Sequence, residues 1–138
     1  MMARRTAIQS LTEAVMSFQL ETIPDDVLSL AKRCLVDVCG VTLAGSKTES
    51  AKLLFSTAAE TYGIGNCDIV GTSQRMNAPC AAFANGAAAH ALDFDDNCYA
   101  GIVHGSAVVF PAVLAVAQQR GEMGSKLLLG FVTGLEVE

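Results

Sequence analysis

Apolar positions along the chain recur mainly at the three- and four-residue spacing of an α-helix. Helices are predicted over residues 6–19 and over residues 22–46, where Gly45 is a natural stop. The apolar face of the second helix is expected to carry Leu28, Ala31, Leu35, Val38 and Thr42. A third helix is expected over residues 48–62. The helical spacing is then lost among glycines, where a short strand-like piece covers residues 67–70.

The second half of the chain also predicts apolar helices. Asn77 is a good cap for an alanine-rich helix over residues 78–94. Small side chains there permit close approach of neighbouring helices. The same close packing is the expected reason for Gly86 in the interior of this helix. A helix over residues 106–120 is apolar on all sides, which indicates a buried central position, and a last helix covers residues 125–138. The predicted fold class is therefore all-α, an antiparallel bundle-like domain with at most one short β element.

Composition narrows the classes of partner. Of the 138 residues, 51% are apolar and 17% are charged, against roughly 25% charged in an ordinary soluble domain. The net charge is −5 and no basic run exists, so nucleic acid and anionic membrane are poor candidates for partners. Five cysteines without CxxC spacing argue against disulfides and zinc. Cys34 and Cys39 are expected to be buried in the second helix.

The sequence also bears on location and completeness. The longest apolar run, residues 107–117, falls short of the ~20 residues that span a bilayer. After Arg5, any apolar core of a signal peptide is interrupted by Thr6, Gln9, Ser10, Thr12 and Glu13. A cytoplasmic protein is therefore expected. Because an apolar helix ends the sequence in mid-pattern, we expect a fragment or truncated form of a longer helical protein. The alternative is a naturally short chain whose last helix docks in a dimer.

Residues 90–105 concentrate the groups that can carry chemistry. They include both histidines, His90 and His104, and three acids, Asp93, Asp95 and Asp96. Asp93 and Asp96 are expected at the C-terminal end of the alanine-rich helix, where the helix dipole disfavours carboxylates. Neighbouring acids also repel one another. A sequence selected for stability alone would avoid this placement, whereas a site that needs a proton-carrying carboxylate would keep it.

The residues by themselves leave several explanations open. Clustered acids are often no more than a solvated turn. A metal-binding helix pair using Asp93, Asp95, Asp96 and His104 would suit Mg²⁺ or Mn²⁺, although the spacing lacks the calcium ligands of an EF-hand. His90 is expected to pair structurally with Asp93, one turn away, and Asp95 to point off the Asp93 face. His104 opens the apolar helix across a loop from the acids, which is typical of an acid/base pair.

A long ordered motif surrounds this window. It reads "FANGAAAHALDFDD", then a short loop, a histidine and "VVFPAVLAVAQQRGEMGSKLLLGFVTGLEVE". The motif resembles the N-terminal helical domain of the MmgE/PrpD family, which includes 2-methylcitrate dehydratase, cis-aconitate decarboxylase and iminodisuccinate epimerase. The resemblance covers nearly the whole chain and about the first third of a family member. It implies that residues 1–138 are the N-terminal part of the helical domain, without the smaller α/β lid domain.

The resemblance also implies roles. Asp93 and His104 match catalytic-site residues, and Asn97 matches a polar residue that contacts the substrate. Gly105 departs from the family, which usually has proline there, and this bears on substrate and activity rather than on fold. No metal or organic cofactor is implied, and family members usually form homodimers.

The function that this resemblance implies is the N-terminal part of a cofactor-independent lyase or isomerase acting on small di- or tricarboxylic acids. Dehydration, decarboxylation and epimerisation stay open, each with proton chemistry beside a carboxylate. The cationic groups that bind substrate carboxylates are expected beyond these residues, since Arg33, Arg75 and Arg120 are scattered. The isolated chain is therefore expected to lack turnover. The rival from another class is a non-catalytic helical module that folds or dimerises without turnover.

Overall fold

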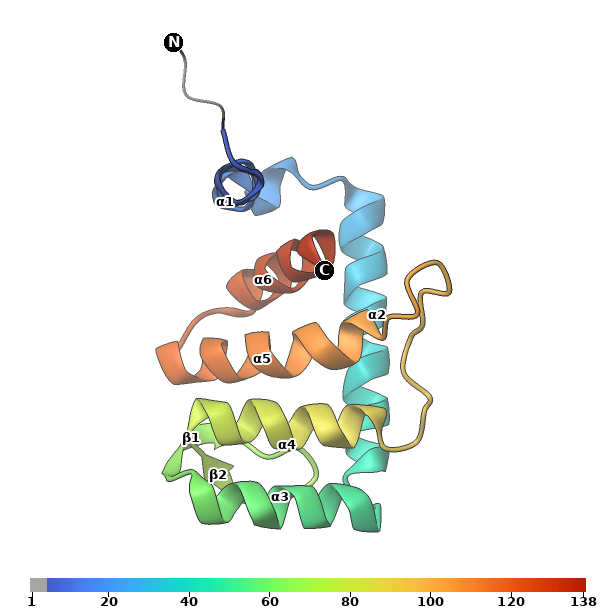
Figure 1. The fold of residues 1–138 in the computed structure, drawn as a ribbon, viewed down its shortest axis with the longest axis vertical. Helices are drawn as coiled ribbons and strands as arrows, with labels where there is room; N and C mark the ends of the chain where they lie inside the picture. The colour runs from blue at the N-terminus through green and yellow to red at the C-terminus, as the bar shows by residue number, and fades with distance from the viewer. Residues whose placement is uncertain (1–4) are drawn as a thin grey trace.

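The computed structural model describes residues 5–138 and shows a stack of helices with one small β-hairpin (Figure 1). The elements are α1 (Ala7–Ser17), the 3₁₀ turn η1 (Leu20–Thr22), α2 (Asp25–Gly45), α3 (Glu49–Thr61), β1 (Ile64–Asp68), β2 (Arg75–Met76), α4 (Ala78–His90), α5 (Gly105–Arg120) and α6 (Gly124–Val137). Helices α3 to α6 lie one above another with alternating chain direction, and α2 runs alongside the stack. The predicted all-α class with one small β element is confirmed.

Helix α2 is the element on which most of the stack packs. It contacts α4, α5 and α6. Its predicted apolar face is confirmed, with three residues buried and two packed against the core: Ala31, Val38, Thr42, Leu28 and Leu35. Asp25 and Asp26 lie in its first turn, where the helix dipole favours carboxylates. Burial of this face against α5 and α6 forms one of the two apolar clusters of the molecule, and α3, α4, α5 and the hairpin form the other.

The end of α2 approaches α4 so closely that no side chain fits between them. A Cβ added at Gly45 would lie 2.0 Å from the carbonyl oxygen of Ala88. Ala88 and Ala89 are themselves buried, as the alanine-rich composition of α4 predicts. The predicted reason for Gly86 is wrong, because a Cβ there would meet its nearest neighbour at an ordinary 3.7 Å and close packing does not require a glycine. The glycine that close packing requires is Gly45.

The hairpin is tied to the helices by two side-chain amides. The buried Asn85 of α4 accepts a hydrogen bond from the Val70 N–H at 2.9 Å and donates to the Asp68 carbonyl at 3.0 Å. Gln118 of α5 accepts from the Asp68 N–H at 2.9 Å. The predicted strand-like piece overlaps β1 only at Cys67 and Asp68, and β2 was not expected, because two residues carry no detectable alternation. Side chains from α4 and α5 therefore complete a sheet that is too short to stand alone.

Cysteine burial differs from the prediction. Cys39 is exposed and Cys34 is half-buried, so the expected burial of Cys39 is wrong: it lies off the face of α2 that carries Val38. The buried cysteines are Cys67 and Cys80, and burial raises the pKa of both thiols. They therefore stay protonated and act as small apolar core residues.

Two helices differ from their predicted extent or burial. Helix α4 ends at His90 rather than at residue 94, because Asp93 adopts the left-handed backbone region, with φ 54°, which an α-helix does not continue through. Helix α5 is central but not buried on all sides, since Val108 is 63% and Val116 48% exposed. Among residues 5–138, no helix combines the length and the hydropathy that crossing a bilayer would take.

The contact at Gly45 gives a direct test of this packing. Gly45→Ala is expected to destabilise the chain by about 1–3 kcal/mol, because the methyl group collides with backbone rather than with a flexible side chain. Gly40→Ala is the matched control in the same helix, where an added Cβ has nothing within 4 Å, and it should be neutral or stabilising by up to ~1 kcal/mol. Urea unfolding of the three proteins measures the difference. Equal stability of the two variants would contradict the close approach.

Candidate active site

The candidate site is built by the loop between α4 and α5, residues 91–104. Cys98 and Val103 pair across it, with the Cys98 N–H donating to the Val103 carbonyl at 2.9 Å. Asp93 and Ile102 both have positive φ, at 54° and 53°. These two turns, which a non-glycine residue seldom adopts, give the loop its course between the end of α4 and the start of α5.

Asp96 is a helix cap. Its carboxylate accepts hydrogen bonds from the Ser106 N–H at 3.0 Å and from the Ser106 hydroxyl at 2.5 Å. His104 is the N-terminal flanking residue of α5 and makes no capping bond of its own. The expectation that Asp96 lies at the C-terminal end of the alanine-rich helix is therefore wrong. It lies at the N-terminal end of the next helix, where the dipole favours a carboxylate.

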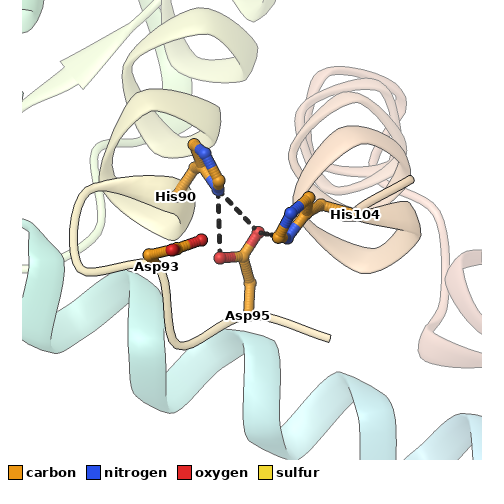
Figure 2. A group of neighbouring side chains, drawn as sticks. All are labelled: His90, Asp93, Asp95 and His104. Carbon is orange, nitrogen blue, oxygen red and sulfur yellow. Dashed lines mark hydrogen bonds and ion pairs between the residues drawn. The ribbon is translucent and has the colours of Figure 1, made fainter. Parts of the chain in front are cut away.

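Asp95 lies between the two histidines, as Figure 2 shows. Its side chain is fully buried. The Nδ1 atom of His90, the last residue of α4, lies 3.1 and 3.0 Å from the two Asp95 oxygens. The Nδ1 atom of His104 lies 3.1 Å from Oδ2. The predictions that Asp95 points away and that His90 pairs with Asp93 are therefore both wrong, because the loop turns at Asp93 and brings Asp95 under both rings.

The two imidazoles also touch each other. Their ring centroids are 4.7 Å apart and the rings meet edge to face at 68°. The Nδ1 atom of His104 is buried and, although it is close to Asp95, its direction does not fit a hydrogen bond. The contact between His104 and Asp95 is therefore electrostatic in this arrangement, whereas that between His90 and Asp95 meets hydrogen-bond geometry.

Asp93 completes the cluster from the solvent side. One donor atom from each of His90, Asp93, Asp95 and His104 lies within 4.8 Å of the others. The two predicted catalytic residues, Asp93 and His104, are thus brought together, along with two residues to which no catalytic role was assigned. Two imidazoles and two carboxylates could also hold a transition-metal ion. That set differs from the predicted metal ligands, since His90 joins it and Asp96, which caps α5, does not.

Both histidines line an open groove of about 830 Å³. The rest of the lining is almost wholly apolar and comes from α3, α4, the loop and α5: Leu54, Ala82, Phe83, Gly86, Ala87, Ile102, Val103, Ala107, Val108 and Ala112. No lysine or arginine lines this groove. Arg75 is instead engaged with Asp68 at 2.8 Å. The groups lining this groove that can carry a positive charge are therefore the two imidazoles.

Asn97, the predicted substrate contact, lies apart from the histidines. It is exposed and lines a separate pocket of about 410 Å³, together with Gly105 and Glu138. A Cβ at Gly105 would come within 2.8 Å of Leu135 Cδ2 and of Glu138 Oε2. The side chains of Leu135 in α6 and of Glu138, which follows it, thus occupy the space beside Gly105, the position where the family pattern usually has proline.

Comparison with known proteins identifies the family of the chain. The model of the MmgE/PrpD N-terminal domain matches residues 9–138. Human cis-aconitate decarboxylase is 30% identical over 146 aligned residues, which cover 99% of this chain and 29% of the human protein. A cis-aconitate decarboxylase-like protein of Aspergillus oryzae is 31% identical over 83% of the chain and 26% of its own length, and mouse cis-aconitate decarboxylase is 28% identical. The chain thus spans less than a third of these relatives.

The capping role of Asp96 can be separated from the chemistry of its neighbours. Asp96→Ala is expected to lower the free energy of unfolding by about 0.5–2 kcal/mol, because α5 loses its cap. Asp96→Asn retains an acceptor oxygen for the Ser106 N–H and should lose less. Asp37→Ala, on the exposed face of α2, should stay within about 0.5 kcal/mol.

Urea unfolding measures these stabilities, and amide hydrogen exchange at the start of α5 localises the effect. Unchanged exchange at Ser106 and Ala107 in the Asp96→Ala variant would contradict the cap.

Proposed function

Because the chain belongs to the MmgE/PrpD family, we propose that it is the N-terminal part of a cofactor-independent lyase acting on small di- or tricarboxylic acids. Asp93 and His104 are its acid–base groups. The observation that supports this best is their meeting, within 4.8 Å, at the junction of two helix ends that line an open groove. Geometry of this kind is the first requirement for proton transfer to or from a bound ligand.

The chemistry needs a base, an acid or both. In a dehydration, a base accepts the proton from the carbon beside a carboxylate, the C–O bond breaks, and an acid protonates the departing hydroxide to give water. In a decarboxylation, the C–C bond to the leaving carboxylate breaks, CO₂ departs, and an acid gives a proton to the carbon. Asp93 is exposed and can accept or return a proton, and His104 can do the same from the start of α5. The relatives named as cis-aconitate decarboxylases favour the second reaction.

The charges around the groove limit the catalysis that Asp93 and His104 can carry out without other residues. A polycarboxylate would enter beside Asp93 and Asp95, and the groove offers only imidazoles as cationic groups. Lysine or arginine from another segment is needed to neutralise the substrate carboxylates. We therefore keep the proposal that the 138-residue chain by itself lacks turnover. Asn97, in the adjoining pocket, supplies a hydrogen bond to a substrate long enough to reach it.

The rival proposal is a helical module without turnover. It is favoured by one observation, the stripe of exposed apolar residues on α5, Val108, Ala112 and Val116, of which the first two line the groove. Such a surface is usually covered by protein, and a second copy of the chain is the proposed partner. A cytoplasmic location and the lack of nucleic-acid and membrane partners also remain proposals.

The acid–base roles are tested by kinetics in a catalytically active form of the protein. Asp93→Asn and His104→Ala should each lower kcat by about 10²–10⁴-fold, because each removes a positioned proton carrier. Asp37→Asn, a carboxylate on exposed α2 surface, should leave kcat unchanged. Excess EDTA should have no effect. Near-normal turnover in both site variants would exclude these roles, and EDTA-sensitive activity restored by a divalent metal would move the same residues to a metal site.

Self-association of the 138-residue chain is tested by analytical ultracentrifugation. The chain should sediment as a dimer or larger species, and Val108→Lys combined with Val116→Lys should shift it toward monomer, since charge on the apolar stripe opposes its burial. Val36→Lys on α2, which is 75% exposed, is the control and should leave the distribution unchanged. A monomeric parent chain would exclude the proposed partner.

A further inference from the structure

Asp95 is the only charged residue that is buried among residues 5–138. No lysine or arginine of the described chain lies within salt-bridge distance of it, and no backbone N–H in residues 5–138 donates to it. Its polar partners are the Nδ1 atoms of His90 and His104. A carboxylate that leaves water for an apolar interior is costly unless it is paired and hydrogen-bonded. The two imidazoles are therefore what makes the burial of Asp95 tolerable.

These contacts constrain where each imidazole carries its proton. A neutral imidazole has one N–H and one lone pair, and the partner of one nitrogen fixes the role of the other. A lone pair on His90 Nδ1 would face a carboxylate oxygen at 3.0 Å, which is repulsive. In His104 the contact is not a hydrogen bond, but a lone pair on its buried Nδ1 would still lie 3.1 Å from the same carboxylate. A proton on Nδ1 makes both contacts attractive. Each ring then has Nε2 as its basic nitrogen, on a ring that lines the groove.

We propose that Asp95 is a positioning residue that holds His90 and His104 as a matched pair, each with Nδ1–H toward its carboxylate and Nε2 available to a ligand in the groove. Both imidazoles exchange protons with the ligand, so that His90 is a second acid–base group beside His104. With the rings 4.7 Å apart, one can accept a proton from, and the other donate a proton to, a single small molecule. The part concerning reaction rests on the proposed function, whereas the tautomers do not.

A metal ion at the same four groups makes the opposite demand. A nitrogen that ligates a metal must present its lone pair, so Nδ1 atoms directed at an ion shared with Asp95 would carry no proton. The hydrogen-bond geometry between His90 Nδ1 and Asp95, and the closeness of His104 Nδ1 to the same carboxylate, favour protons on Nδ1. The two arrangements are therefore distinguishable by locating a proton on each ring.

The experiment is a tautomer measurement on the ¹⁵N-labelled 138-residue chain. The chain contains two histidines, so long-range ¹H–¹⁵N spectra hold two imidazole patterns, and His90→Gln assigns them. Above the pH at which both rings become neutral, each should show the Nδ1–H tautomer. In Asp95→Asn the preference should be lost or reversed to Nε2–H at both rings, as replacement of an orienting carboxylate by an amide predicts. Asp37→Asn should leave both patterns unchanged.

The wild-type spectrum alone can overturn the proposal, whether or not Asp95→Asn folds. An Nε2–H tautomer at either ring would do so. A shift of both Nδ1 signals on adding Zn²⁺, from a wild-type state without Nδ1 protons, would also overturn it and identify a metal site.

Turnover is the separate arm. In an active form, Asp95→Asn should lower kcat about 10²-fold or more with KM little changed, and His90→Gln should lower kcat as well. Nδ1–H tautomers at both rings in a protein that catalyses nothing would uphold the pairing and remove only the proposed reaction.

Discussion

The close approach of α2 to α4 at Gly45 and Ala88 is the constraint on which the rest of the site depends. It fixes α4 against α2 two residues before His90. The cap from Asp96 to Ser106 fixes where α5 begins, one residue after His104. With both helix ends held, the two imidazoles meet around Asp95 without any direct bond between the helices at that point. Packing between helices thus sets the geometry of a cluster that a loop of this length would not hold by itself.

The helices could be predicted from the sequence because their spacing of apolar residues is local information. The buried face of α2 and the cap at Asn77 follow directly from it. The hairpin was only half predicted, since its strands are completed by Asn85 and Gln118, which lie far away in the chain. Burial of α5 was overestimated for a related reason. A helix that is apolar on all sides has no polar face in its sequence, so the exposure of Val108 and Val116 cannot be predicted from residue spacing.

The sequence indicates which residues could belong to the candidate site, but it does not indicate which of them contact one another. Asp93 and His104 were identified by their place in a motif, and the structure brings them together. The central role of Asp95 was missed, because it depends on the backbone turning at Asp93 through a positive φ, which leaves no mark in residue spacing. A signal was nevertheless present in the chain. Both histidines lie in a window that also contains three carboxylates, and an imidazole is one of the few partners that can stabilise a buried carboxylate without a nearby lysine or arginine.

The three acids of this window meet three different requirements, and their spacing is what allows it. Asp93 takes the left-handed turn that ends α4, a conformation that aspartate adopts more readily than most residues, and stays at the surface. Asp95 and Asp96 are adjacent, yet their side chains reach different partners. One enters the space between the imidazoles and the other reaches the first turn of α5. The cluster that looked electrostatically unfavourable in the sequence is therefore resolved by separate surroundings for each carboxylate: solvent for Asp93, the imidazoles for Asp95 and Ser106 for Asp96.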